Sequence, residues 1–67
     1  MSEINAQVGQ RIRQLRTERD WLQSDLASAT HLPMRTIGRI ERGEVDVRLS
    51  TLEKIAKAFN IPLRDLL

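Results

Sequence analysis

The chain has 67 residues, a net charge of +2, no cysteine and a single histidine, His31. This length allows one small domain and leaves no room for a deep active-site cleft. The absence of cysteine excludes disulfide bonds, and one histidine does not supply a metal site or a catalytic cluster. We therefore expect no cofactor, no metal ion and no enzymatic activity.

The composition is typical of a soluble folded domain, with 40% hydrophobic and 30% charged residues. No apolar run approaches the ~20 residues that cross a bilayer, and the amino terminus lacks a signal-peptide core. These features predict a cytoplasmic protein without a membrane segment. Most of the basic residues are arginines, whose planar guanidinium groups suit phosphates and guanine edges, so their placement along the chain matters.

Apolar residues recur at helical spacing throughout, which predicts an all-α fold of five short helices. The expected helices cover about residues 4–19, 23–29, 34–42, 50–60 and 62–67. Gly43 should end the third helix, and Asn60 should end the fourth. Ser50 followed by Glu53 is typical of a capping box at the start of the fourth helix. The residues expected to face inward include Ile4, Val8, Ile12, Leu15, Leu26, Ala27, Leu52, Ile55, Ala56 and Phe59, and Leu63, Leu66 and Leu67 share one side of the last turn.

Residues 23–42 have the spacing of a helix-turn-helix, with a tight turn around His31 and Leu32. Counting from Gln23, the fifth position is Ala27, where a small side chain lets the two helices approach closely. Ile37 and Ile40 then fall on the side that packs into the domain. A plain helical bundle could show the same apolar spacing, so the polar residues must distinguish the two folds.

The helix expected at residues 34–42 has an apolar face and an opposite basic face. At about 100° per residue, the basic face carries Arg35, Gly38, Arg39 and Arg42, and no carboxylate of the helix lies among them. The major groove of B-form DNA admits a helix, and arginine pairs with the O6 and N7 acceptors of guanine. We interpret this face as one that reads bases, the alternative being an ordinary solvated surface.

Glu41 falls on the inward side of the same helix, where an ionised carboxylate needs a partner. Arg16 flanks the apolar stripe of the first helix and is the expected partner. Such a pair would set the angle between the first and third helices. The alternative places Glu41 at a solvated helix end beside Gly43.

Several separated motifs carry a family resemblance: Arg16, the run Gln23-Ser24-Asp25-Leu26-Ala27, the run Ile37-Gly38-Arg39-Ile40-Glu41-Arg42-Gly43, and the run Leu52-Glu53-Lys54-Ile55-Ala56-Lys57-Ala58-Phe59. With these motifs the chain resembles the phage repressor and Cro-type helix-turn-helix domains, which include small bacterial regulators and controller proteins. The resemblance extends from about residue 8 to residue 67. It implies a compact five-helix repressor-like domain over residues 1–67 that binds double-stranded operator DNA, usually as a symmetric homodimer.

The resemblance also implies roles for individual residues. Gln23 is expected at the phosphate backbone, Met34, Arg35 and Arg39 occupy base-facing positions, and Arg16 with Glu41 matches the family's buried ion pair. The expected DNA-contact residues are Gln23, Met34, Arg35, Thr36, Arg39, Arg42 and, through spare guanidinium donors, Arg16.

The sequence departs from the family pattern around the turn. Leu22 and Pro33 stand where the family usually has a Ser or Thr cap, which puts a hydroxyl contact to phosphate in doubt. His31 replaces a turn glycine and is expected in a left-handed conformation.

We therefore expect a sequence-specific transcriptional regulator, a repressor or autoregulator, that reads the major groove of a palindromic operator with its third helix. A protein-interaction module such as an antitoxin is the main alternative, and a nuclease or other enzyme lacks the necessary acid-base or metal cluster. Ile61, Leu63, Leu66 and Leu67 form the candidate homodimer interface, although these side chains could instead close the domain's own core.

Overall fold

Four α-helices and one 3₁₀ turn make up the regular structure of residues 2–67, which the computed structural model describes. The elements are α1 (Glu3–Glu18), α2 (Gln23–Thr30), α3 (Met34–Glu41), α4 (Leu49–Phe59) and the 3₁₀ turn η1 (Leu63–Leu66). The described residues form no β-strand, so the all-α prediction is confirmed. The predicted count of five helices is not, because the fifth is a 3₁₀ turn.

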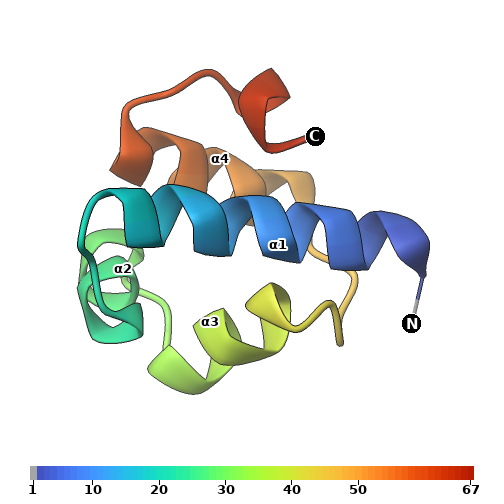
Figure 1. The fold of residues 1–67 in the computed structure, drawn as a ribbon, viewed down its shortest axis with the longest axis horizontal. Coiled ribbons are helices and arrows are strands. Elements are labelled where there is room, and N and C mark those ends of the chain that lie inside the picture. The colour runs from blue at the N-terminus through green and yellow to red at the C-terminus, as the bar shows by residue number, and fades with distance from the viewer. Residues whose placement is uncertain (1) are drawn as a thin grey trace.

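The long helix α1 crosses the middle of the molecule, with α3 on one side of it and α4 and η1 on the other (Figure 1). Helix α2 packs against both α3 and α4 and closes one end. The enclosed core contains side chains from all five elements: Val8, Ile12, Leu15, Leu26, Ile37, Ile40, Leu52, Ile55, Ala56, Phe59 and Leu66. No helix in this part of the chain combines the length and apolar character that a membrane span requires.

Left-handed residues end two of the helices, as the sequence predicts. His31 ends α2 with φ 60°, and Asn60 ends α4 with φ 58°. Gly43 has φ 71° and follows α3, where a Cβ would also collide with the backbone of Ala6. Histidine and asparagine tolerate this conformation better than bulky apolar residues do. These residues let the chain reverse sharply, and the helices can remain short.

Two packing predictions are wrong. Ile4 is 58% exposed because the first turn of α1 extends beyond the helices that cover its later turns. Leu67 is 66% exposed whereas Leu66 is buried, because a 3₁₀ turn advances 120° per residue and so points consecutive side chains apart. Leu63 is half-buried, three residues before Leu66 on the same side of the turn.

The predicted start of α4 is also wrong. Its N-cap is Arg48, with no side-chain capping bond, and Ser50 lies inside the first turn. The preceding loop is held in place because Val45 and Val47 pack against the core and Asn5 donates to the Asp46 carboxylate. Because the loop is anchored in this way, the N-cap of α4 is Arg48, two residues before the predicted cap at Ser50.

Candidate nucleic-acid interface

Helices α2 and α3 meet through a tight three-residue turn. The N–H of Leu32 donates to the carbonyl of Ala27 (3.2 Å), and Pro33 then acts as the N-cap of α3. The carbonyl of Pro33 accepts from the N–H groups of Thr36 and Ile37, which begins α3. Proline is tolerated here because its missing N–H would have no partner at a helix start. The structure thus has the two helices of a helix-turn-helix within residues 23–42.

The outward face of α3 carries polar and apolar side chains that have no place in the core. Ile37 and Ile40 are buried on the inward face, while Met34 is 55% exposed. Arg35 and Arg39 are exposed with it. The remaining members of the face are Thr36, which is half-buried, Gly38, which is buried, and Arg42, which is exposed and caps the end of α3. This face is therefore free to meet a partner along the whole length of the helix.

A buried ion pair joins α1 to α3 behind that face. Arg16 donates from Nε and Nη2 to the two carboxylate oxygens of Glu41, at 2.7 and 3.0 Å, and from Nη1 to the carbonyl of Trp21 at 2.7 Å. The Glu41 hydrogen bond is the main cause that raises the pKa of Arg16 above its ordinary value. The pair expected from the helical register is present. Both charged side chains are shielded from water, and their buried polar atoms all have hydrogen-bond partners.

Gln23 extends this network to the start of α2. Its Nε2 donates to Glu41 Oε1 at 3.2 Å, so one carboxylate connects the three helices of the site. The main-chain N–H of Leu22 is bonded separately, to the carboxylate of Asp25 at 2.7 Å. The orientation of α2 relative to α3 is consequently set by this part-buried hydrogen bond from Gln23 as well as by apolar packing.

The close approach of α1 and α3 depends on Gly9. A Cβ at this position would lie 2.6 Å from the carbonyl oxygen of Glu41, and the carbonyl of Ile40 is nearer still. Both clashing atoms belong to the backbone, so no side-chain rotation can relieve the clash. Gly9 is not predicted from the sequence, because nothing local in the chain indicates which helical glycine faces another helix.

One carboxylate does lie beside the arginines of α3, contrary to the expectation from the helix alone. Glu44, in the loop after Gly43, accepts from Arg42 Nε at 2.6 Å, and its other oxygen is 4.0 Å from Arg39 Nε. The hydrogen bond from Arg42 lowers the pKa of the Glu44 carboxyl and raises that of Arg42. The helical projection missed this residue because Glu44 lies beyond the helix and returns to it through the left-handed turn at Gly43.

The comparisons with known proteins agree with this geometry. The sequence profile of the family HTH_3, described as Helix-turn-helix, matches residues 12–66. The chain belongs to this family. Among its helix-turn-helix relatives, the HTH-type transcriptional regulator SutR of Escherichia coli K12 is 43% identical over 51 residues, which are 76% of this chain and 29% of SutR. The control protein C.BamHI of Bacillus amyloliquefaciens is 37% identical over 67 residues, 98% of this chain and 83% of that protein.

A solved structure has the same helix-turn-helix fold over nearly its whole length. The restriction-modification controller protein C.AhdI from Aeromonas hydrophila superposes with a TM-score of 0.91 at 36% identity, covering 94% of this chain and 96% of that one. The chain spans about half or less of the length of other curated relatives that it matches.

Two arginines outside the helix-turn-helix also have structural contacts. Arg19 donates to the carbonyls of Leu15 and Phe59 and lies over the Phe59 ring, 4.9 Å from its centroid. Arg11 donates to the carbonyl of Asp65 at 2.9 Å. Arg11 lies in α1 and Arg19 is its C-cap, so the bonds to Asp65 and Phe59 join the carboxy-terminal part of the chain to α1.

Proposed function

We propose that residues 1–67 act as a sequence-specific double-stranded DNA-binding domain of a transcriptional regulator, a repressor or autoregulator, with no catalytic step. The observation that carries the proposal is the exposed face of α3, on which Met34, Arg35 and Arg39 project from a helix whose other side is buried. A helix of this kind fits the major groove, where arginine pairs with guanine and an apolar side chain can meet the thymine methyl group. The regulatory role of the relative SutR supports the same assignment.

In this proposal the residues around the base-reading face have different tasks. Gln23 flanks the face and contacts the phosphate backbone, Arg42 lies at the carboxy-terminal end of the face, and Thr36 lies at its edge. Arg16 is a positioning residue, because its side chain is buried and each guanidinium nitrogen already donates to a protein acceptor. Phosphate contacts fix the register of a protein on DNA, and base contacts supply the specificity.

We further propose a homodimer on a palindromic operator. One reading helix spans only a few base pairs, whereas two related by a twofold axis can engage half-sites about 34 Å apart. The exposed Leu67 and the half-buried Ile61 and Leu63 provide an apolar surface at the carboxy-terminal end. A cytoplasmic location, as predicted from the sequence, is part of the same proposal.

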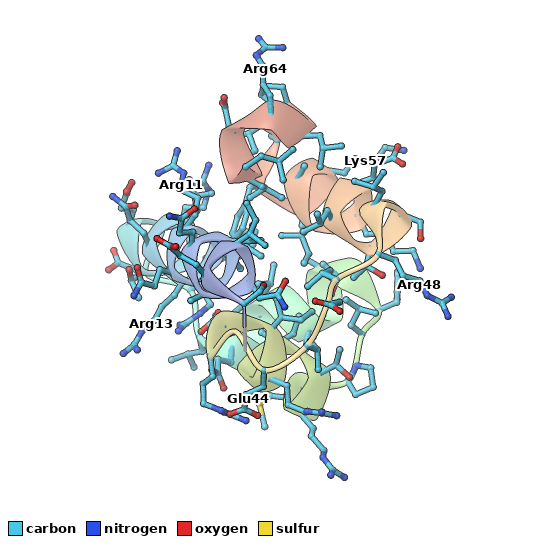
Figure 2. The ribbon with its side chains drawn as sticks, turned by 90° about the vertical axis from the view of Figure 1, so that its right-hand side faces the viewer. Arg11, Arg13, Glu44, Arg48, Lys57 and Arg64 are labelled. Carbon is cyan, nitrogen blue, oxygen red and sulfur yellow. The ribbon has the colours of Figure 1, made fainter. Side chains whose placement is uncertain are left out.

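The test is selection of binding sites from a random duplex library, followed by titration of variants on the selected site. Arg35→Ala and Arg39→Ala should each cost about 1–3 kcal/mol and relax the preference at particular base pairs. Gln23→Ala should weaken binding to all sequences more evenly. Arg64→Ala is the matched control, because Arg64 lies at the end of the molecule opposite Glu44 and α3 (Figure 2).

Equal, sequence-independent losses for the three test variants would overturn the assignment of the reading face. A purified chain that shows no salt-dependent DNA binding but holds a protein partner would instead favour the protein-interaction module.

A further inference from the structure

We propose that Glu44 is a specificity-determining residue that suppresses binding to DNA lacking the recognised sequence. It does so by occupying Arg42 and by placing a negative charge beside Arg39, on the face that meets the duplex. The inference rests on the DNA-binding function proposed above. It adds a role for Glu44, which lies outside the predicted set of DNA-contact residues.

The Glu44 carboxylate lies close to both Arg42 and Arg39. Arg42 donates to it from Nε at 2.6 Å and from Nη2 at 3.4 Å, and Arg39 Nε lies 4.0 Å away. The Glu44 N–H also donates to the carbonyl of Arg39 at 3.0 Å, which fixes the backbone from which the carboxylate projects. Figure 2 places Glu44 at the α3 end of the molecule, remote from Arg64.

Gly38 determines where the paired guanidinium lies. A Cβ at residue 38 would be 3.0 Å from Arg42 Nη1 and 3.8 Å from Gln23 Oε1, so the guanidinium lies over the glycine and beside Gln23. Arg42 is thus folded back along α3 over Gly38, although more than half of its side chain stays exposed. To contact a phosphate in another position, it must leave both this surface and Glu44.

The pair does not serve the stability of the fold. The Arg42 and Glu44 side chains are 59% and 40% exposed, and exposed ion pairs contribute little to folding. The pair instead changes the net charge that a DNA ligand meets on this face. With Glu44 ionised, the three side chains carry a net charge of +1 where the two arginines alone would carry +2.

Random and matched sequences respond differently to such a carboxylate. Binding to random DNA depends almost wholly on phosphate neutralisation and counterion release, so a lost phosphate contact and an added negative charge weaken it directly. At a matched site, base contacts by Arg35 and Arg39 add binding free energy that random DNA does not supply, and the complex does not require Arg42 to extend to a new phosphate. Glu44 therefore widens the gap between the two affinities.

The experiment compares the parent chain with Glu44→Gln, which keeps the size and an acceptor but removes the charge. Affinities for the selected operator and for a shuffled duplex are measured between 50 and 200 mM KCl. For the shuffled duplex we expect the slope of log K against log salt to steepen by about 0.9, the value for one additional phosphate. The ratio of operator to shuffled affinity should fall, and its fall should be about threefold larger at 50 mM than at 200 mM KCl, because a slope change of about 0.9 over this salt range is a factor of that size.

Three controls identify the cause. Glu53→Gln removes the same charge from an exposed position on α4 and should leave the ratio unchanged. Adding Arg42→Gln to Glu44→Gln should return the salt slope on shuffled DNA to that of the parent. Thermal melting of Glu44→Gln should match that of the parent, because the pair is exposed.

An unchanged or higher affinity ratio in Glu44→Gln would overturn the inference while leaving the proposed function intact, because the parent chain would still bind its operator. An equal fall in the ratio for Glu53→Gln would also overturn it, since net charge would then be the cause. A parent chain that binds neither duplex would overturn the proposed function together with this inference.

Discussion

The Arg16–Glu41 pair provides the most direct test of how the site is held together. Glu41→Ala removes the acceptor of three hydrogen bonds, two from Arg16 at 2.7 and 3.0 Å and one from Gln23 at 3.2 Å. The Arg16 side chain is only 11% exposed, so water cannot replace the lost carboxylate without rearrangement. Removing one member of a buried pair costs about 3–5 kcal/mol because the other charge is stranded.

This loss is large for a chain of 67 residues, whose total stability is about 3–10 kcal/mol. Since each kcal/mol shifts Tm by roughly 4–8 °C in a domain of this size, Glu41→Ala should lower Tm by at least about 12 °C. The measurement is circular dichroism during heating and during urea titration at pH 7, without DNA.

Two further variants separate charge from packing. Glu41→Gln keeps one oxygen acceptor and should lose less stability than Glu41→Ala. The double substitution Arg16→Met with Glu41→Leu removes both charges and should restore much of the loss, because apolar replacements of a buried pair are often neutral. A Glu41→Ala chain that melts at the parent temperature would refute the reasoning, since the pair would then contribute nothing to the fold.

Two other substitutions test the close helix contact and the proposed dimer. Gly9→Ala should lower Tm because the new Cβ meets backbone carbonyls of α3. This clash should outweigh the helix propensity of alanine, which is about 1 kcal/mol better than that of glycine. An equal or higher Tm by circular dichroism would contradict the close contact. Leu67→Asp should leave thermal unfolding of the monomer unchanged, since Leu67 is 66% exposed, but should abolish self-association in sedimentation equilibrium. A parent chain that is monomeric both free and on full-site DNA would rule out the dimer.

Local sequence signals predicted most of the fold. The spacing of Val8, Ile12 and Leu15 indicated one buried face of α1, and these residues are buried. His31 and Asn60 were predicted to stop or turn the chain, and both are left-handed. Such signals succeed because helix periodicity and backbone conformation depend on residues within a few positions of each other.

The helical register also predicted the pairing of Glu41 with Arg16, 25 positions apart. An ionisable side chain that falls on an apolar face must find a partner, and few charged residues in so short a chain lie beside the facing stripe. The predicted DNA contacts of Gln23, Arg35 and Arg39 remain predictions, because they depend on a ligand and on measurements of binding.

The sequence by itself determined the helical class, the turn between α2 and α3 and the separation of apolar from basic faces, because each follows from the order of neighbouring residues. Only the tertiary structure decided which helix ends are covered by other parts of the chain and which charged side chains form pairs. Ile4 is exposed because the first turn of α1 extends beyond the helices that cover its later turns. Helix α4 starts at Leu49 because the loop before it is anchored by Val45, Val47 and Asp46. Glu44 meets Arg42 because a left-handed turn at Gly43 folds the loop back onto α3. Contacts of this kind depend on the path of the chain through space, which the periodicity of a single helix does not describe.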